Sequence, residues 1–157
     1  AVLTQRGASV DFVEYHEFDL PLYNDTIDIP QHAYQIAARI KAAKGIIVSS
    51  PEYNCSYPAS LKNIIAWISR LDPNPLKEKP IFLMSASTGA RGGISGLDHL
   101  KRPFESQEAF IYPRVFPLGS CATAFDAGGS LEHKHASALA PMLEAYLKFS
   151  EALAHGH

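Results

Sequence analysis

Two short loops hold the residues whose types and spacing best suit ligand-binding chemistry. The first, PEYNCSY, covers residues 51–57, and the second, ASTGARGG, covers residues 86–93. Glycine has no Cβ atom, so Gly89, Gly92 and Gly93 would let the backbone turn tightly and come close to a ligand. Each loop directly follows an apolar run, GIIVS or PIFLMS, that is typical of a buried parallel strand.

Other kinds of chemistry find little support. Cys55 and Cys121 lie far apart, and none of the seven histidines has metal-ligand spacing, so we expect neither a disulfide framework nor a metal site. The formal net charge is -2 and no basic stripe is present, which argues against a nucleic-acid partner. No apolar run approaches the roughly 20 residues of a membrane span, and no signal peptide is evident. We therefore expect a cytoplasmic protein with a small-molecule ligand.

The elements that must position the two loops alternate along the chain. The patterning predicts strands at 9–15, 45–49, 80–85 and 109–116, and helices at 33–43, 58–70, 97–103 and 137–153. This alternation is typical of a parallel sheet with helices on both faces, in one domain over residues 1–157. Ligands of such sheets bind beyond the carboxyl ends of the strands, so the two loops should share one edge.

A family resemblance is carried by the segment GIIVSSPEYNCSYPASLKNIIAWISR, residues 45–70. It resembles the signature region of the NADPH-dependent FMN reductases, a family that includes flavin, quinone, azo-dye and chromate reductases. The PEYN tetrapeptide, the serine two residues later, the helix-opening proline, LKN and W-x-S-R occur in the family order. Residues 85–93 resemble the family's S-x-x-x-G-x-x-G-G element. The resemblance implies a flavodoxin-like three-layer α/β sandwich with a parallel sheet.

The resemblance also implies a cofactor site. An isoalloxazine ring needs a flat slot and backbone hydrogen bonds to its pyrimidine edge. By resemblance, FMN would be bound by residues of both loops: Pro51, Glu52, Tyr53, Asn54, Ser56, Ser87, Thr88, Gly89, Gly92 and Gly93. The flavin would carry the chemistry, with no catalytic side chain and no metal. NADPH or NADH would be the donor, and the acceptor a quinone, flavin, azo compound or metal oxyanion.

The start of the sequence departs from the family pattern. Family members begin with a buried strand and a G-S-x-R-x-x-S-x-N loop that holds the FMN phosphate. Here residues 1–7, AVLTQRG, resemble the end of the first helix instead. In the strand order 2-1-3-4-5 the absent strand is central, so we expect segments 9–15 and 45–49 to have unpaired inner edges. A strand, loop and helix correspond to roughly 30 to 40 further N-terminal residues.

Two alternative functions remain open at this stage. One is a flavodoxin-type electron carrier or sensor that acts on a protein partner, and the other is a flavin-free protein that serves only in association. For the reductase, the resemblance implies a homodimer or homotetramer. The interface would use the apolar residues of the helix after PEYN, Ile64, Ile65, Trp67 and Ile68.

Overall fold

A central parallel strand organises the sheet. In the computed structural model of the chain, which describes residues 2–154, β2 (Pro80–Ala86) is buried along most of its length. It pairs in parallel with β1 (Ile46–Ser49) on one side. On its other side it pairs in parallel with two short strands, β3 (Phe110–Ile111) and then β4 (Phe116–Leu118).

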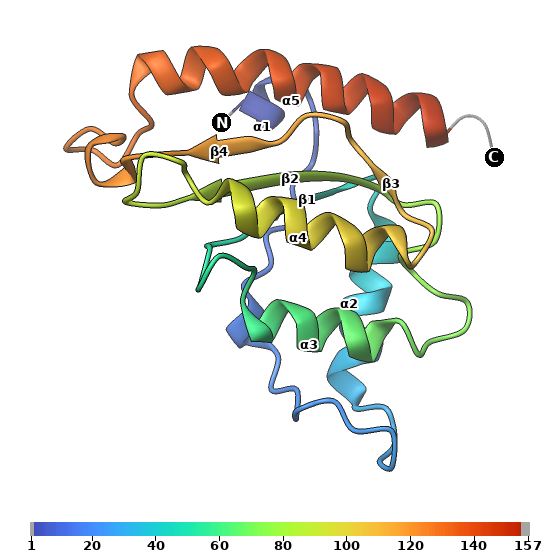
Figure 1. Cartoon of the computed structure of the whole chain (residues 1–157). Coiled ribbons are helices and arrows are strands. Elements are labelled where there is room, and N and C mark those ends of the chain that lie inside the picture. The colour runs from blue at the N-terminus through green and yellow to red at the C-terminus, as the bar shows by residue number, and fades with distance from the viewer. Residues whose placement is uncertain (1, 155–157) are drawn as a thin grey trace.

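Helices cover both faces of this sheet, as Figure 1 shows. One face carries α5 (His133–Ala154), with α1 (Val2–Gln5) packed beside it. The other face carries α2 (Gln31–Ala42), α3 (Ala59–Ile68) and α4 (Ile94–Glu105). Two 3-10 turns, η1 (Tyr15–Glu17) and η2 (Cys121–Thr123), lie in the connections. The predicted three-layer α/β arrangement is confirmed.

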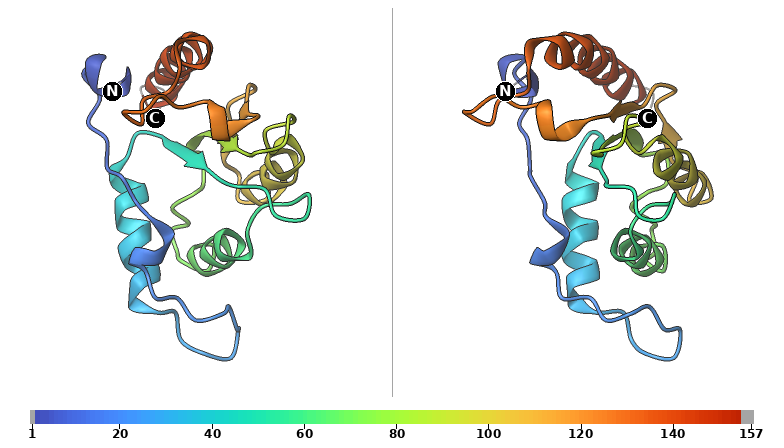
Figure 2. Two further views of the ribbon diagram at one scale, coloured as in Figure 1. Left: turned by 90° about the vertical axis from the view of Figure 1, so that its left-hand side faces the viewer. Right: turned by 60° about the vertical axis from the view of Figure 1, so that its left-hand side comes forward.

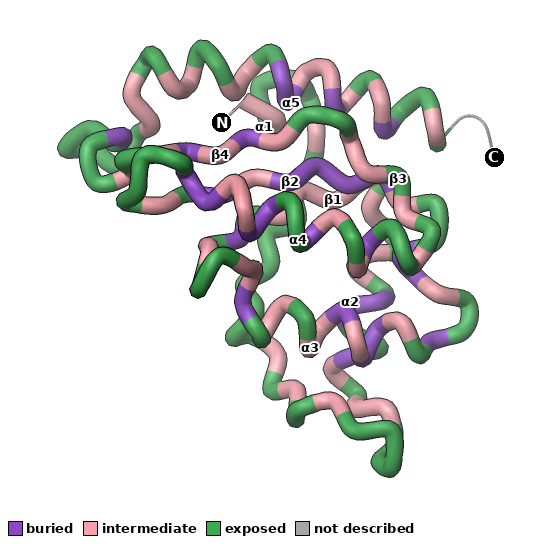
Figure 3. Tube along the Cα trace, in the orientation of Figure 1, coloured by how far each residue is buried: buried purple, intermediate pink, exposed green. Residues whose placement is uncertain are grey.

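Alternation along β2 divides the core into two clusters. Successive side chains of a strand point to opposite faces. Phe82 accordingly packs in the cluster under α5, with Tyr146 and Met142. Ile81 and Leu83 pack in the cluster on the side of α2, α3 and α4. Figure 3 shows burial concentrated along β2 and the inner helix faces, while the loop tips are exposed.

Residues 9–15 do not form the predicted strand. They run irregularly beside α2 (Figure 2), and Phe12 is 73% exposed. Arg39 of α2 holds the segment, donating from Nε to Asp11 Oδ2 at 2.8 Å and from Nη2 to Phe12 O at 2.9 Å. The pattern favoured a strand, but within residues 2–154 this segment pairs with no strand. The edge of β1 away from β2 is unpaired there, as expected, and the segment does not form a ladder with it.

The other strand predictions need smaller corrections. The strand predicted at 109–116 is two short strands, because residues 112–115 leave the ladder between them. β1 was expected to be fully buried. Its Ile46, Ile47 and Val48 are only half-buried, since the strand lies at the edge of the described sheet.

α4 and α5 extend further than the sequence indicated, while α3 is shorter than the predicted helix at 58–70. α4 continues past Pro103 to Glu105, because the Ser106 N–H still donates to Arg102 O at 3.0 Å beyond the proline. α5 begins at His133, within the HKH segment, and not at residue 137. No described helix is long and apolar enough to cross a bilayer.

Three of the four apolar residues of α3 that were expected at an interface, Ile65, Trp67 and Ile68, are buried within the chain itself, while Ile64 is half-buried. Trp67 is 1% exposed, and its Nε1–H donates to Pro21 O at 2.7 Å. The Tyr23 ring meets the indole edge-on at 4.9 Å between centroids. Asn63 accepts the Tyr23 N–H at 2.7 Å and donates to Pro21 O at 2.9 Å. Residues 20–23 therefore cover Trp67 on α3, the helix that was predicted to have surplus apolar surface.

Candidate functional site

The PEYN loop (residues 51–57) and the glycine-rich loop (residues 86–93) lie at the same end of the sheet, on the left in Figure 1. Each leaves the carboxyl end of a strand, the first after β1 and the second after β2. The Ser50 N–H donates to Met84 O at 2.9 Å, which extends the β1–β2 ladder to the start of the first loop. The prediction that these loops share one edge is confirmed.

A tight two-residue turn forms the tip of the first loop. The Tyr53 N–H donates to Ser56 O at 2.8 Å, and the Ser56 N–H donates back to Tyr53 O at 3.0 Å. Asn54 and Cys55 both have positive φ, 50° and 62°, as a type I′ turn requires. A cysteine in this region is strained. The turn leaves Tyr53, Asn54 and Cys55 exposed, as is Pro51 before them, while Ser56 is half-buried.

The second loop depends on two glycines. Gly92 has φ +62°, and a Cβ there would lie 2.6 Å from both Gly119 N and Pro117 C. Gly93 has φ +81° and ends the loop as the residue before α4. Ser85, at the end of β2, donates from Oγ to Gly92 O at 2.5 Å. Backbone conformation and close contact therefore require glycine at both positions.

The start of the second loop is more open. Ser87 is half-buried, and its Oγ accepts the Gly89 N–H at 3.2 Å. Thr88 and Gly89 are exposed. A Cβ on Gly89 would meet only Ser87 Oγ, at 3.7 Å, so packing does not explain this glycine. The open side leaves room for a ligand.

A third loop, missed by the sequence reasoning, joins the same edge. It follows β4, and Cys121 N–H donates to Ser87 O at 3.0 Å while Ser120 N–H donates to Gly89 O at 3.2 Å. The Ser87 N–H in turn donates to Leu118 O at 3.0 Å. The Gly-Ser pair after Leu118 was the available signal. It went unused because the predicted strand ended at 116.

One side chain connects the first loop to the second. The Glu52 carboxylate accepts the Gly96 N–H in the first turn of α4, with Oε2 at 2.7 Å from the nitrogen. The Glu52 Cβ also lies 3.3 Å from where a Cβ on Gly93 would stand. The site thus brings Glu52 and Gly93 together. No hydrogen bond joins the exposed Asn54–Cys55 tip to the second loop within residues 2–154.

Unpaired backbone donors complete the picture of the site. The N–H groups of Asn54, Cys55, Thr88 and Ala90 make no hydrogen bond within the described chain. Burial raises the pKa of the nearby Tyr57 phenol above its ordinary 10.0. No cluster of three metal-binding side chains occurs among the residues the structure describes. The four unpaired N–H groups are therefore free to donate to the polar edge of a ligand.

Comparison with known proteins gives a consistent result. Residues 1–123 match the family model described as NADPH-dependent FMN reductase. The chain is 34% identical over 146 residues to the NADH:(hydroxy)cinnamate reductase subunit CrdA of Vibrio ruber, covering 88% of this chain and 71% of that protein. It is 38% identical over 97 residues to the quinone reductase of Escherichia coli K12, covering 59% of this chain and 52% of that protein.

A solved structure agrees over nearly the whole chain. FerB, a flavoenzyme NAD(P)H:(acceptor) oxidoreductase from Paracoccus denitrificans, superposes with a TM-score of 0.81 at 28% identity. The superposition covers 96% of this chain and 86% of FerB.

The two loops fit the ring of FMN better than its phosphate. The unpaired N–H groups of both loops and the open side of Gly89 are the features that a pyrimidine edge requires. A phosphate would favour a free helix N-terminus. At α4 that position is already filled by the Glu52 carboxylate, whose negative charge would repel a phosphate.

Proposed function

The chain belongs to the NADPH-dependent FMN reductase family, and from this premise we propose that it forms the flavin-ring site of an NAD(P)H:acceptor oxidoreductase. The observation that carries the proposal is the joining of the two loops through Glu52 and Gly96, with unpaired backbone donors on each loop. The family uses FMN, with NAD(P)H as electron donor.

The protein's part in this function is binding and orientation. When bound, FMN supplies the chemistry, accepting hydride from NAD(P)H and passing electrons to the acceptor. In this proposal, the Asn54 and Thr88 N–H groups, which are unpaired in the described chain, would donate to the polar edge of the ring. The strained turn at 53–56 holds the first loop in one conformation, and Gly92 and Gly93 hold the second. No side chain of the site needs to act as a nucleophile.

We propose a small aromatic acceptor of the quinone class. Similar proteins are named quinone reductase, 2-hydroxy-1,4-benzoquinone reductase and NADH:(hydroxy)cinnamate reductase subunit. One slot above the ring would have to release the nicotinamide before the acceptor enters. Ping-pong kinetics with parallel double-reciprocal lines is therefore the expected pattern.

The decisive experiment measures cofactor and turnover on the same sample. The natively purified protein should show a flavin absorption band, and the released cofactor should have the mass of FMN. NAD(P)H should then be consumed continuously with a free quinone. Release of FAD would contradict the cofactor assignment, and intersecting double-reciprocal lines would contradict the single slot.

An electron carrier or sensor is the second candidate, and the same assay separates it from the reductase. A carrier would bind FMN and exchange electrons with a protein, but it would not sustain turnover with a free quinone. Protein without any flavin would leave only the association role.

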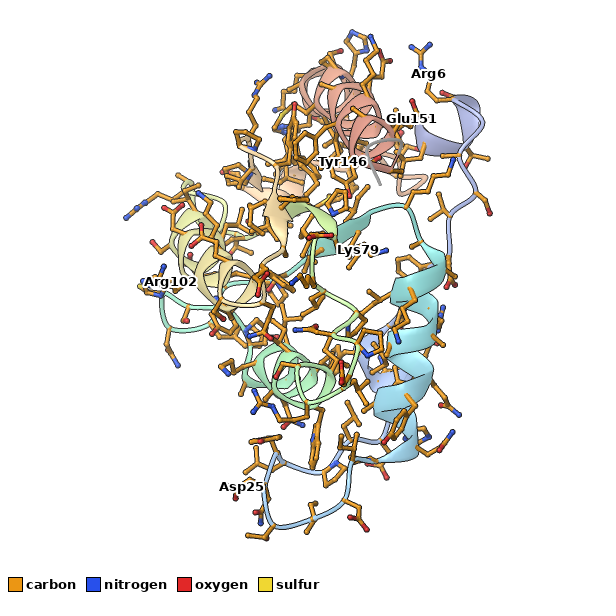
Figure 4. The ribbon with its side chains drawn as sticks, turned by 90° about the vertical axis from the view of Figure 1, so that its right-hand side faces the viewer. Arg6, Asp25, Lys79, Arg102, Tyr146 and Glu151 are labelled. Atoms are coloured by element: carbon orange, nitrogen blue, oxygen red, sulfur yellow. The ribbon has the colours of Figure 1, made fainter. Side chains whose placement is uncertain are left out.

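We also propose a homodimer or homotetramer in the cytoplasm. Much of the apolar face of α3 is buried inside the chain, so the contact would use other surface, such as Leu22, which is 82% exposed, and Ile27 beside it. These residues lie on the projecting loop that carries Asp25 at its tip (Figure 4). A monomer by light scattering at micromolar concentration would refute the assembly, and cell fractionation tests the location.

A further inference from the structure

α4 begins with a residue that cannot cap it. The N-cap residue is Gly93, which has no side chain to accept a hydrogen bond from the first turn. The first N–H groups of a helix have no partner within the helix and usually need a side-chain acceptor. The cap here comes from another part of the chain, because Glu52 Oε2 accepts the Gly96 N–H at 2.7 Å across 44 residues of sequence.

Glu52 and Ser56 pack closely against Gly96, in the first turn of α4. A Cβ on Gly96 would lie 3.1 Å from Ser56 O and 3.3 Å from both Cβ and Cγ of Glu52. The first loop therefore lies directly on the first turn of α4. A side chain at Gly96 would require Ser56 or Glu52 to move by a few tenths of an ångström.

Charge strengthens the contact. A carboxylate bonded to a helix N-terminal N–H makes a charge-assisted hydrogen bond and also interacts favourably with the helix dipole. Glu52 forms no ion pair within residues 2–154, so α4 is the partner of its charge.

We propose that Glu52 is a positioning residue, which sets the distance between the two ring-binding loops through the Gly96 N–H instead of contacting the ring with its carboxylate. The inference rests on the proposed function, since it concerns the same site. It refines the family resemblance, which placed Glu52 along the ring.

Three substitutions at Glu52 separate positioning from charge. Glu52→Gln keeps an oxygen that accepts from Gly96 and should retain FMN affinity within about threefold. Glu52→Ala removes the acceptor and should weaken FMN binding at least tenfold, because the hydrogen bond that joins the first loop to α4 is lost. Glu52→Asp is too short to reach and should resemble Glu52→Ala.

An independent variant approaches the same contact from the other side. Gly96→Ala introduces a Cβ against Glu52 and Ser56 and should also weaken FMN binding. The matched control is Glu105→Gln, which removes one carboxylate from the far end of α4, where Glu105 pairs only with Arg102 on the surface. This control should leave FMN affinity unchanged.

The test combines three measurements on the full chain: the FMN dissociation constant, the absorption spectrum of bound flavin, and hydrogen exchange of the Gly96 amide without flavin. Positioning predicts faster Gly96 exchange, a shifted spectrum and weaker binding in Glu52→Ala, with rescue in Glu52→Gln. Unchanged affinity and spectrum in Glu52→Ala would overturn the inference, even if thermal stability fell. Equal losses in Glu52→Gln and Glu52→Ala would also overturn it, because charge would then be the cause. If the unmodified protein bound no FMN, the proposed function itself would fail, which is a distinct result.

Discussion

Replacing Gly45 with alanine tests how α5 is anchored to the sheet. Gly45 precedes β1, and a Cβ there would lie 2.4 Å from the Tyr146 Oη. That hydroxyl, in a side chain only 2% exposed, lies 2.8 Å from Ile46 O and 3.0 Å from Pro80 O and donates to them. Figure 4 shows Tyr146 directed from α5 toward the sheet. The substitution must displace either the hydroxyl or the helix.

The magnitudes follow from these contacts. Tyr146→Phe removes the hydroxyl that bonds to these two carbonyls and should cost about 0.5–1.5 kcal/mol of unfolding free energy. Gly45→Ala overpacks the same place and should cost about 1–3 kcal/mol. Once the hydroxyl is gone, the nearest remaining atoms are the Tyr146 Cζ and Ser150 Cβ, each at 3.2 Å. The double variant should therefore be more stable than the sum of the single effects predicts, by about 1 kcal/mol or more.

Urea unfolding followed by circular dichroism measures this coupling. The fluorescence of Trp67, the chain's single tryptophan, provides a second probe of the same transition. A control cycle pairs Tyr146→Phe with Gly128→Ala, because Gly128 is exposed and its Cβ would contact only Asp126 Oδ1. The control should be additive. If the two unfolding free-energy changes of the Gly45 cycle add within about 0.3 kcal/mol, the Tyr146 hydroxyl is not the group that a Cβ at position 45 displaces.

Three further outcomes are expected. Cys55→Gly should raise stability by up to about 1 kcal/mol in thermal unfolding. The relief of left-handed strain, about 1–2 kcal/mol, should exceed the entropy cost of a new glycine, about 0.4–1 kcal/mol; no gain would contradict the strain. Burial raises the pKa of the Tyr146 phenol above its ordinary 10.0, so the unfolded state ionises first and wild-type stability falls as pH rises above that value; Tyr146→Phe should show a smaller alkaline loss in urea titrations, and an equal loss would refute this. Asn63→Ala should free residues 20–23 and speed their proteolysis, at a cost of about 1–2 kcal/mol; unchanged cleavage would mean that Trp67 alone holds the loop.

Local sequence patterns predicted the parts of the fold that local forces determine. The apolar runs at 45–49 and 80–85 became β1 and β2, and the loops after them meet at one edge. Gly92 and Gly93 could be assigned a mechanical role because positive φ is a local property.

Features that depend on distant partners could not be predicted in this way. The segment at 9–15 has a strand pattern, yet without a neighbour in the ladder it stays irregular. Two hydrogen bonds join residues more than 40 positions apart. One links Trp67 to Pro21, and the other links Gly96 to Glu52. Periodicity within a window carries no information about such contacts.

The contacts that anchor α5 and the loops of the proposed binding site lie at opposite ends of β2. At the amino end, Tyr146 ties α5 to the start of the strands, and Lys79 donates to Ala43 O at 2.6 Å. At the carboxyl end, glycines, a strained turn and the Glu52 cap hold the two loops in which we propose the flavin-ring site. A seven-residue strand separates these ends by roughly 20 Å, well beyond the range over which substitutions usually couple. The Gly45 cycle should therefore change unfolding free energy while leaving FMN affinity unchanged.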